Sequence, residues 1–182
     1  MRRADQKGLC LHASAVNVAG KALLFLGYST SGKSTISRLL SERYPVIADD
    51  RVWVFKNKGF WLIQNGSNYF STKDKKTNIA GEKNKYPLLA IVRIFKSKTL
   101  EVEPLSAKKA CRYLMDAVFE IDFQRRQKDF ETKKKWFSAA AEISKIIAGW
   151  RLTFKKDKSI IKKIHETFEE RLLSKCGKEK LG

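Results

Sequence analysis

The chain has 182 residues, 43% of them hydrophobic, and a formal net charge of +19. This length suits a single domain with a real core, and the sequence contains no run of 18 apolar residues that could span a membrane. The basic N-terminus lacks the apolar segment of a signal peptide. The three cysteines lie far apart without a metal-binding pattern, as idle thiols do in a reducing compartment. We therefore expect a cytoplasmic protein.

The positive charge would attract polyanions such as nucleotides, RNA or an acidic protein. The excess is mostly lysine, scattered along the chain without the aromatic interleaving of nucleic-acid-binding motifs. A solvated lysine-rich surface is therefore favoured, and a nucleic-acid partner stays the less favoured alternative. The origin of the charge and the oligomeric state are left open by the composition.

The strongest motif is GYSTSGKST at residues 27–35, which matches the pattern G-x-x-x-x-G-K-[ST] of a phosphate-binding P-loop. Apolar residues 22–26 before it predict a buried strand, and the apolar positions within residues 35–43 predict a helix. Two glycines would let the backbone approach an anion, and the loop amides would cradle phosphates at the helix N-terminus. The predicted nucleotide-binding residues are Gly27, Tyr28, Ser29, Thr30, Ser31, Gly32, Lys33, Ser34 and Thr35.

Two residues of this motif carry specific chemistry. Lys33 would place a positive charge at the β- and γ-phosphates, and Ser34 would offer its hydroxyl to Mg²⁺. The sequence therefore predicts ATP and Mg²⁺ as ligands, although GTP or pyrophosphate would satisfy the same loop. A glycine-bearing turn without a ligand is the structural alternative.

A strand is predicted at residues 11–18, and a turn at Gly20 would pair it with the strand that enters the P-loop. His12 lies on this first strand. There it could hydrogen-bond a carboxylate or meet a phosphate, although a lone histidine can also be structural.

Pro45 ends the first helix, and residues 46–48 predict a short buried strand that ends in Asp49 and Asp50. Ligands collect at strand ends in open α/β sheets. One carboxylate could hold Mg²⁺, while the other could take a proton from an attacking hydroxyl, as the catalytic aspartate of kinases does. Mg²⁺ and Lys33 would offset the repulsion between the two carboxylates. A solvated Asp-Asp turn is the alternative.

The rest of the chain predicts strands, a long loop and then helices. Residues 51–55 and 60–63 are expected as a hairpin, residues 65–87 as a long loop near the site, and residues 88–95 as a strand with residues 99–105 as its hairpin partner. Helices are expected at about 107–119 with Ser106 as N-cap, at 125–148 ending at Gly149, and at 158–174. Residues 150–154 alternate like an edge strand, and His165 is expected at the surface or at the boundary of the core rather than as a ligand.

Residues 11–12, the hairpin through Gly20, residues 27–34 and residues 47–52 together resemble the kinase domain of HPr kinase/phosphorylase, whose P-loop architecture is related to that of phosphoenolpyruvate carboxykinases. The resemblance implies one α/β domain over residues 1–182, with a mixed sheet, β-hairpins and C-terminal helices. It also implies an ATP-dependent, Mg²⁺-requiring kinase that phosphorylates a serine or another hydroxyl.

The resemblance also implies roles for single residues. Asp49 would be the base, Asp50 would support the metal or His12, and His12 would match the histidine that precedes the P-loop in this family. Lys33 would bind phosphates, and Ser34 would be the metal ligand. The chain has no segment like ELRGLG, which is linked to target recognition and dephosphorylation in the family. The acceptor is therefore left open between a protein serine and a small molecule, and the family's ring assemblies leave a homo-oligomer open.

Two other functions fit parts of the sequence. Small-molecule kinases of the shikimate or nucleoside type share the motif but run mostly βαβ, so their P-loop strand would lie among parallel strands. A non-catalytic module that holds a nucleotide or a polyanion would suit the charge of +19.

Overall fold

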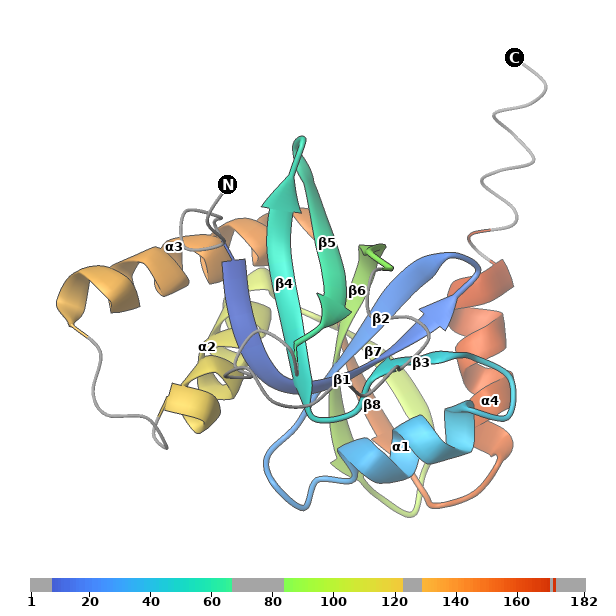
Figure 1. Ribbon diagram of the computed structural model, residues 1–182. Coiled ribbons are helices and arrows are strands. Elements are labelled where there is room, and N and C mark those ends of the chain that lie inside the picture. Colours follow the sequence, from blue (N-terminus) through green and yellow to red (C-terminus); the bar gives the residue numbers. More distant parts are fainter. Residues whose placement is uncertain (1–7, 67–83, 123–128, 171, 173–182) are drawn as a thin grey trace, which may run out of the picture.

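The computed structural model describes residues 8–66, 84–122, 129–170 and 172, which form a mixed α/β fold (Figure 1). Within these ranges no helix combines the length and apolar character that a membrane crossing needs. The strands are β1 (Gly8–Val18), β2 (Lys21–Leu26), β3 (Val46–Ala48), β4 (Arg51–Asn57), β5 (Phe60–Asn65), β6 (Tyr86–Lys96), β7 (Glu101–Leu105) and β8 (Gly149–Phe154). The helices are α1 (Lys33–Leu40), α2 (Ala107–Asp122), α3 (Phe130–Ile146), α4 (Ser159–Ile164) and the π-helical turn η3 (His165–Glu169).

Six strands make the main layer in the order β3-β1-β2-β6-β8-β7. The pairs β2–β6 and β6–β8 are parallel, and the other pairs are antiparallel. The predicted hairpin of β1 and β2 is confirmed, with Val18 opposite Lys21 across the turn. The mixed sheet expected from the sequence is therefore present.

The long strand β1 joins this layer to a second group of strands. Its first half, Gly8 to His12, pairs with β4, and its second half pairs with β2. The predicted hairpin of β4 and β5 is also present, and β5 pairs with the beginning of β6. Because β2 also pairs with β6, the strands β1, β4, β5, β6 and β2 close on themselves.

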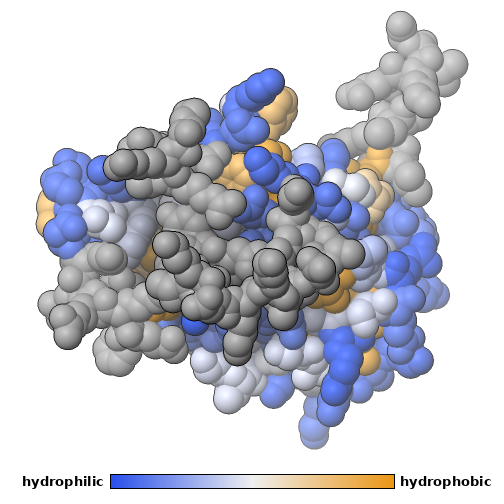
Figure 2. Space-filling view, viewed as in Figure 1, coloured by the Kyte–Doolittle hydropathy of each residue, from blue (hydrophilic) through white to orange (hydrophobic). Residues whose placement is uncertain are grey.

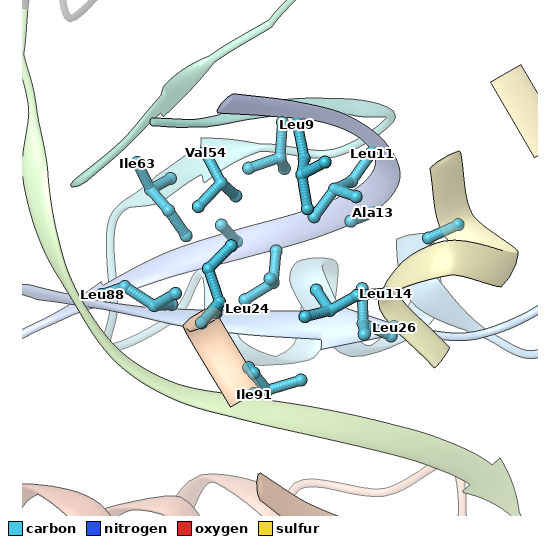
Figure 3. Close-up of a cluster of buried hydrophobic side chains, with 14 of the residues drawn as sticks. Leu9, Leu11, Ala13, Leu24, Leu26, Val54, Ile63, Leu88, Ile91 and Leu114 are labelled. Atoms are coloured by element: carbon cyan, nitrogen blue, oxygen red, sulfur yellow. The ribbon is translucent and has the colours of Figure 1, made fainter. Parts of the chain in front are cut away.

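Two hydrophobic clusters lie on opposite faces of β2. Leu24 and Leu26 point into the cluster that β1, β4, β5, α2 and α3 enclose (Figure 3). Leu23 and Phe25 point to the other face, where α1, α4 and η3 cover the sheet. Successive strand residues face opposite sides, and all four are fully buried. Apolar packing on both faces therefore fixes the strand that leads into residues 27–32.

The C-terminal half of the sheet corrects two predictions. β7 pairs with β8 and not with β6, so residues 99–105 are not the hairpin partner of residues 88–95. β8 lies between β6 and β7, so it is not an edge strand. Its first residue, Gly149, was expected to end the preceding helix. A Cβ at Gly149 would lie 3.2 Å from Ala110 Cβ and 3.3 Å from the Leu105 carbonyl oxygen, so close packing against α2 and β7 favours glycine there.

The strand before the two aspartates also differs from the prediction. β3 pairs antiparallel with β1 at the edge of the layer, and Val46 is 41% exposed. Asp49 and Asp50 therefore follow a partly exposed edge strand and not the buried strand that the sequence predicted.

Several element boundaries shift as well. Helix α1 begins at Lys33, and α3 begins at Phe130 behind its N-cap Asp129, whose carboxylate accepts from the Thr132 amide. Most of the predicted loop at 65–87 lies outside the described residues, as does the end of the last predicted helix.

A carboxylate ties the end of α1 to the C-terminal helical segment. Glu169 Oε2 accepts hydrogen bonds from the Tyr44 hydroxyl at 2.8 Å and from Arg43 Nη2 at 3.2 Å, and it lies 2.8 Å from His165 Nδ1. Burial favours the protonated carboxyl, but the hydrogen bonds from His165 and Tyr44 and the Arg43 charge together hold the pKa of Glu169 below its ordinary value. His165 is thus part of an ion-pair cluster.

We expect Glu169→Gln to lower the free energy of unfolding at pH 7 by about 1–3 kcal/mol, because charged hydrogen bonds are lost. The pKa of Glu169 is lower in the folded than in the unfolded protein. The ionised carboxylate therefore stabilises the fold at pH values above the ordinary pKa of 4.5, and this contribution is lost as the pH falls below 4.5 and through the folded-state pKa. The difference between wild type and variant should therefore shrink in urea titrations at low pH. Glu101→Gln, at an exposed position of β7, is the matched control and should change stability little.

Candidate functional site

Residues 27–32 connect the C-terminal end of β2 to α1, and their backbone depends on two glycines. A Cβ on Gly27 would overlap the Ser31 side chain. Gly32 has φ 101°, and a Cβ there would lie 3.0 Å from Phe154 Cζ and 3.2 Å from Lys96 Cε. Larger residues would strain this turn, so the glycines allow the tight entry into α1.

The Lys33 side chain folds back over this turn. Its Nζ donates to the Gly27 carbonyl oxygen at 2.6 Å and to the Tyr28 carbonyl oxygen at 3.1 Å, and the residue is only 6% exposed. Burial lowers the pKa of Lys33, while the charges of Glu120, Asp50 and Asp49 act in the opposite direction. A buried ammonium group therefore lies within the electrostatic reach of three carboxylates.

The beginning of α1 adds backbone donors. Gly32 is the N-cap residue and makes no side-chain cap, while Ile36 donates its amide to the Gly32 carbonyl oxygen at 2.9 Å. The first amides of a helix lack intrahelical partners and carry partial positive charge. These amides and Lys33 together form a surface suited to an anion.

A pocket of about 340 Å³ opens over the start of α1. Its polar and apolar walls come from β1, the 27–32 turn, α1 and the end of β6. The lining residues are His12, Ser29, Thr30, Gly32, Lys33, Ser34, Thr35 and Lys96.

His12 stands between two carboxylates beside this pocket. Its Nδ1 lies 2.8 Å from Glu120 Oε2, and its Nε2 lies 3.4 Å from Asp50 Oδ1. The Asp50 backbone is held against β1, because its carbonyl oxygen accepts from the Ala13 amide at 3.1 Å. The Asp50 carboxylate also lies 3.4 Å from Arg51 Nε and is 69% exposed. The pairing of His12 on β1 with Arg51 on β4 thus brings His12 beside Asp50, the residue before Arg51.

Glu120 on α2 is a site residue that the sequence did not single out. Besides contacting His12, its Oε1 accepts from the Ser29 amide at 3.2 Å. One turn earlier on the same helix, Asp116 Oδ2 accepts from the Tyr28 hydroxyl at 3.4 Å. Two carboxylates four residues apart on one helix face were the available signal. The predicted helix ended at residue 119, which left Glu120 outside it.

Arg93 on β6 is a second such residue. It is 3% exposed, and its guanidinium carbon lies 4.2 Å from the Tyr28 ring centroid and 4.5 Å from that of Tyr113. Its Nε is buried without a hydrogen-bond partner. Stacking on the two rings stabilises this cation, and its charge contributes to the lowered pKa of Lys33.

The structure therefore brings most of the predicted site residues together. Asp50 contacts His12. The predicted site residues that line the pocket are His12, Ser29, Thr30, Gly32, Lys33, Ser34 and Thr35. Asp49 is exposed, and its charge reaches Lys33. Tyr28 lies over Arg93 at the rim of the turn.

The family model described as SynChlorMet cassette protein ScmC matches residues 1–169. The chain belongs to this family. The description names no activity, and no curated protein matches the chain.

Among solved structures, the chain is similar to the Hpr(Ser) kinase/phosphatase from Coxiella burnetii. The TM-score is 0.48 with 12% sequence identity, and the alignment covers 91% of this chain and 97% of that chain.

Glu120→Ala should free the 27–32 turn, because the Ser29 amide loses its acceptor and His12 loses one of its two carboxylate partners. We expect hydrogen exchange at the Ser29 amide, followed by NMR, to accelerate by at least about tenfold, the effect of losing about 1.4 kcal/mol of protection. Exchange in the β2 core should stay as in wild type. Glu101→Ala removes a carboxylate from exposed β7 and serves as control. An unchanged Ser29 amide would show that Glu120 does not hold the turn.

Proposed function

We propose that this protein is an ATP-dependent phosphotransferase that moves the γ-phosphoryl group to a serine or another hydroxyl. The observation that carries the proposal is the buried Lys33, which lines a pocket, donates from its ammonium group to two loop carbonyls and lies within the electrostatic reach of three carboxylates. A turn that depends on two glycines and the N-terminus of a helix lie beside this lysine, which is the setting in which backbone amides bind anions.

The phosphates would be bound by the 27–35 segment. Backbone amides of the turn and of the first turn of α1 would donate to the β-phosphate, and Lys33 would contact the β- and γ-phosphates. Lys96 lines the same pocket and adds a second positive charge. This donor set recognises phosphates and not bases, so it does not distinguish ATP from GTP. ATP is proposed because the sequence resemblance to HPr kinase/phosphorylase implies it.

Mg²⁺ fits the donors at this site. Ser34 lines the pocket, and the exposed Asp50 carboxylate lies 3.4 Å from His12, which also lines it. Mg²⁺ is usually held by one or two carboxylates together with substrate phosphates rather than by an all-protein cage. Within the described residues no group of three or more His, Cys, Asp or Glu side chains could hold a metal alone. Bound there, Mg²⁺ would neutralise charge on the phosphates.

The transfer step would use the two aspartates in different roles. Asp49 would accept the proton of the incoming hydroxyl as its oxygen forms a bond to the γ-phosphorus, while the bond from that phosphorus to the bridging oxygen breaks and ADP leaves. His12, fixed by Glu120, would hold Asp50 in place. Lys33 would stabilise the charge that develops on the transferred group.

The topology bears on the first rival function. β2 lies between antiparallel β1 and parallel β6. A kinase of the shikimate or nucleoside type would place this strand among parallel strands, so the arrangement favours the proposal. The second rival is a module that holds a nucleotide without turning it over. The topology fits this module equally well, and the Asp49→Asn experiment below distinguishes it from the proposal.

Lys33→Ala should weaken ATP binding by about 1–3 kcal/mol, because the phosphates lose a charged partner. Isothermal titration with ATP and Mg²⁺ measures this change. Lys98→Ala removes an equal charge at an exposed turn and should bind ATP almost as wild type does. Equal affinities for wild type and Lys33→Ala would contradict the site assignment.

Asp49→Asn should lower the rate of transfer from γ-labelled ATP to hydroxyl acceptors at least about a hundredfold, because the amide cannot take the proton.

His12→Ala should lower turnover while ATP affinity changes little. Asp50→Asn should instead raise the Mg²⁺ concentration needed for half-maximal rate. If wild type binds ATP without transfer to any acceptor and Asp49→Asn changes nothing, the nucleotide-holding module is the better description.

A further inference from the structure

A second and larger concavity lies between α2 and α3, away from the 27–35 segment. Its volume is about 830 Å³, more than twice that of the phosphate-site pocket. We call it the α2–α3 groove, and Met115, Phe119, Phe137 and Ala141 are among its apolar lining residues. In Figure 1 these two helices form one side of the molecule, apart from α1 and α4.

The apolar side chains of the groove are unusually open to solvent. Phe130 is 75% exposed, Phe137 59% and Phe119 41%. They are three of the seven large exposed hydrophobic residues in the described part of the chain. By contrast, hydrophilic side chains cover much of the molecule around α4 (Figure 2). A gathering of exposed aromatic rings at one concave site is typical of a surface that binds a partner.

The rim of the groove is strongly basic. Among the described residues that line it, five are Lys or Arg and none is Asp or Glu. They come from both helices, so positive charge flanks the apolar floor on two sides. The lining residues with this charge are Lys108, Arg112, Lys133, Lys134 and Lys145.

We propose that the α2–α3 groove binds an amphipathic helix of another protein or peptide, whose apolar stripe is flanked by acidic residues. A groove between two helices accepts the ridge of a third helix through anchors spaced three and four residues apart. The rim selects for acidic flanks by charge complementarity.

The charge also decides against other occupants. A second copy of this chain would bring its own basic rim and a net charge of +19 to the same interface. A lipid bilayer offers a broad flat surface, whereas these apolar side chains line a concave site between two helices, a shape that fits a rod-like helix better.

Helix α2 connects the groove with the phosphate site. It presents Met115 and Phe119 to the groove, and Asp116 and Glu120 to the turn at Tyr28 and Ser29. A helix bound in the groove would therefore contact the same element that positions the turn. Binding in the groove does not depend on the proposed phosphotransfer, and it is tested without nucleotide.

The probe is a synthetic fluorescein-labelled helix of about 15 residues, with leucines at helical spacing and glutamates at the other positions. Fluorescence anisotropy with the full chain at about 0.15 M salt should give saturable binding. A scrambled peptide of the same composition, and one with lysine in place of glutamate, should each bind at least about tenfold more weakly.

Two pairs of variants locate the binding. Phe137→Ser should weaken peptide binding at least about tenfold, whereas Phe60→Ser, at a 69% exposed ring outside the groove, should leave it unchanged. Lys133→Glu with Lys134→Glu should weaken it similarly. Lys21→Glu with Lys98→Glu makes the same change in net charge elsewhere and should have less than about a threefold effect. All these side chains are exposed or half-buried, so the variants should fold.

The outcomes separate the proposal from its competitors. Lys33→Ala should bind the peptide as wild type does, whatever becomes of ATP binding. The proposal is overturned if binding is not saturable, if the scrambled peptide binds equally, or if both charge-reversal pairs lose affinity alike. It is also overturned if Phe137→Ser changes a dimer into a monomer in light scattering. Loss of flotation with anionic vesicles in that variant, without peptide binding in wild type, would point to a membrane instead.

Discussion

The arrangement of the site depends on the burial of one ammonium group. Moving the Lys33 charge out of water costs several kcal/mol unless it is paired and hydrogen-bonded. Here two carbonyl oxygens of the preceding turn supply the hydrogen bonds, and carboxylates from two other elements supply the compensating charge. The turn can offer its carbonyls only because β2 is packed on both faces and Gly27 leaves room for the Ser31 side chain. The core and the site are thus parts of one arrangement.

Helix α2 contacts the core, the turn before α1 and the α2–α3 groove with three different faces. Ala110, Leu114 and Ala117 pack into the core that β1 and β2 share. Asp116 and Glu120 contact the turn before α1, and Glu120 also contacts His12 on β1. The third face carries apolar and basic residues to the α2–α3 groove. A displacement of this helix would change the hydrogen bond to the Ser29 amide, because the same helix lines the groove and contacts the turn before α1.

Local sequence patterns predicted those elements whose structure depends on interactions between residues close together in the chain. The β1–β2 hairpin follows from the turn at Gly20, and the strand–turn–helix around Lys33 follows from glycine spacing and apolar periodicity. The position of β8 between β6 and β7 could not be predicted this way, because two helices separate β7 from its partner along the chain. Glu120 and Arg93 were missed for a similar reason. Arg93 is a lone charge in the apolar stretch of a strand, and the spacing of Asp116 and Glu120 on one helix face does not tell what the two carboxylates contact. Both roles appear only when distant elements place these side chains beside Tyr28 or His12.

The distribution of charge gives the site a character opposite to that of the rest of the chain. Only 19 residues are acidic against 38 basic ones, yet Asp49, Asp50, Asp116 and Glu120 all lie around the turn before α1. These carboxylates alone would repel the triphosphate of the proposed function, and Lys33, Arg93 and Lys96 lie close by to offset their charge. A divalent ion between the carboxylates and the phosphates would bring the charges nearer to balance. The basic surface would meanwhile raise the local concentration of any anionic substrate. In the proposed function, scattered lysines would supply the long-range attraction, and the cluster of acids with Lys33, Arg93 and Lys96 would supply the local selectivity.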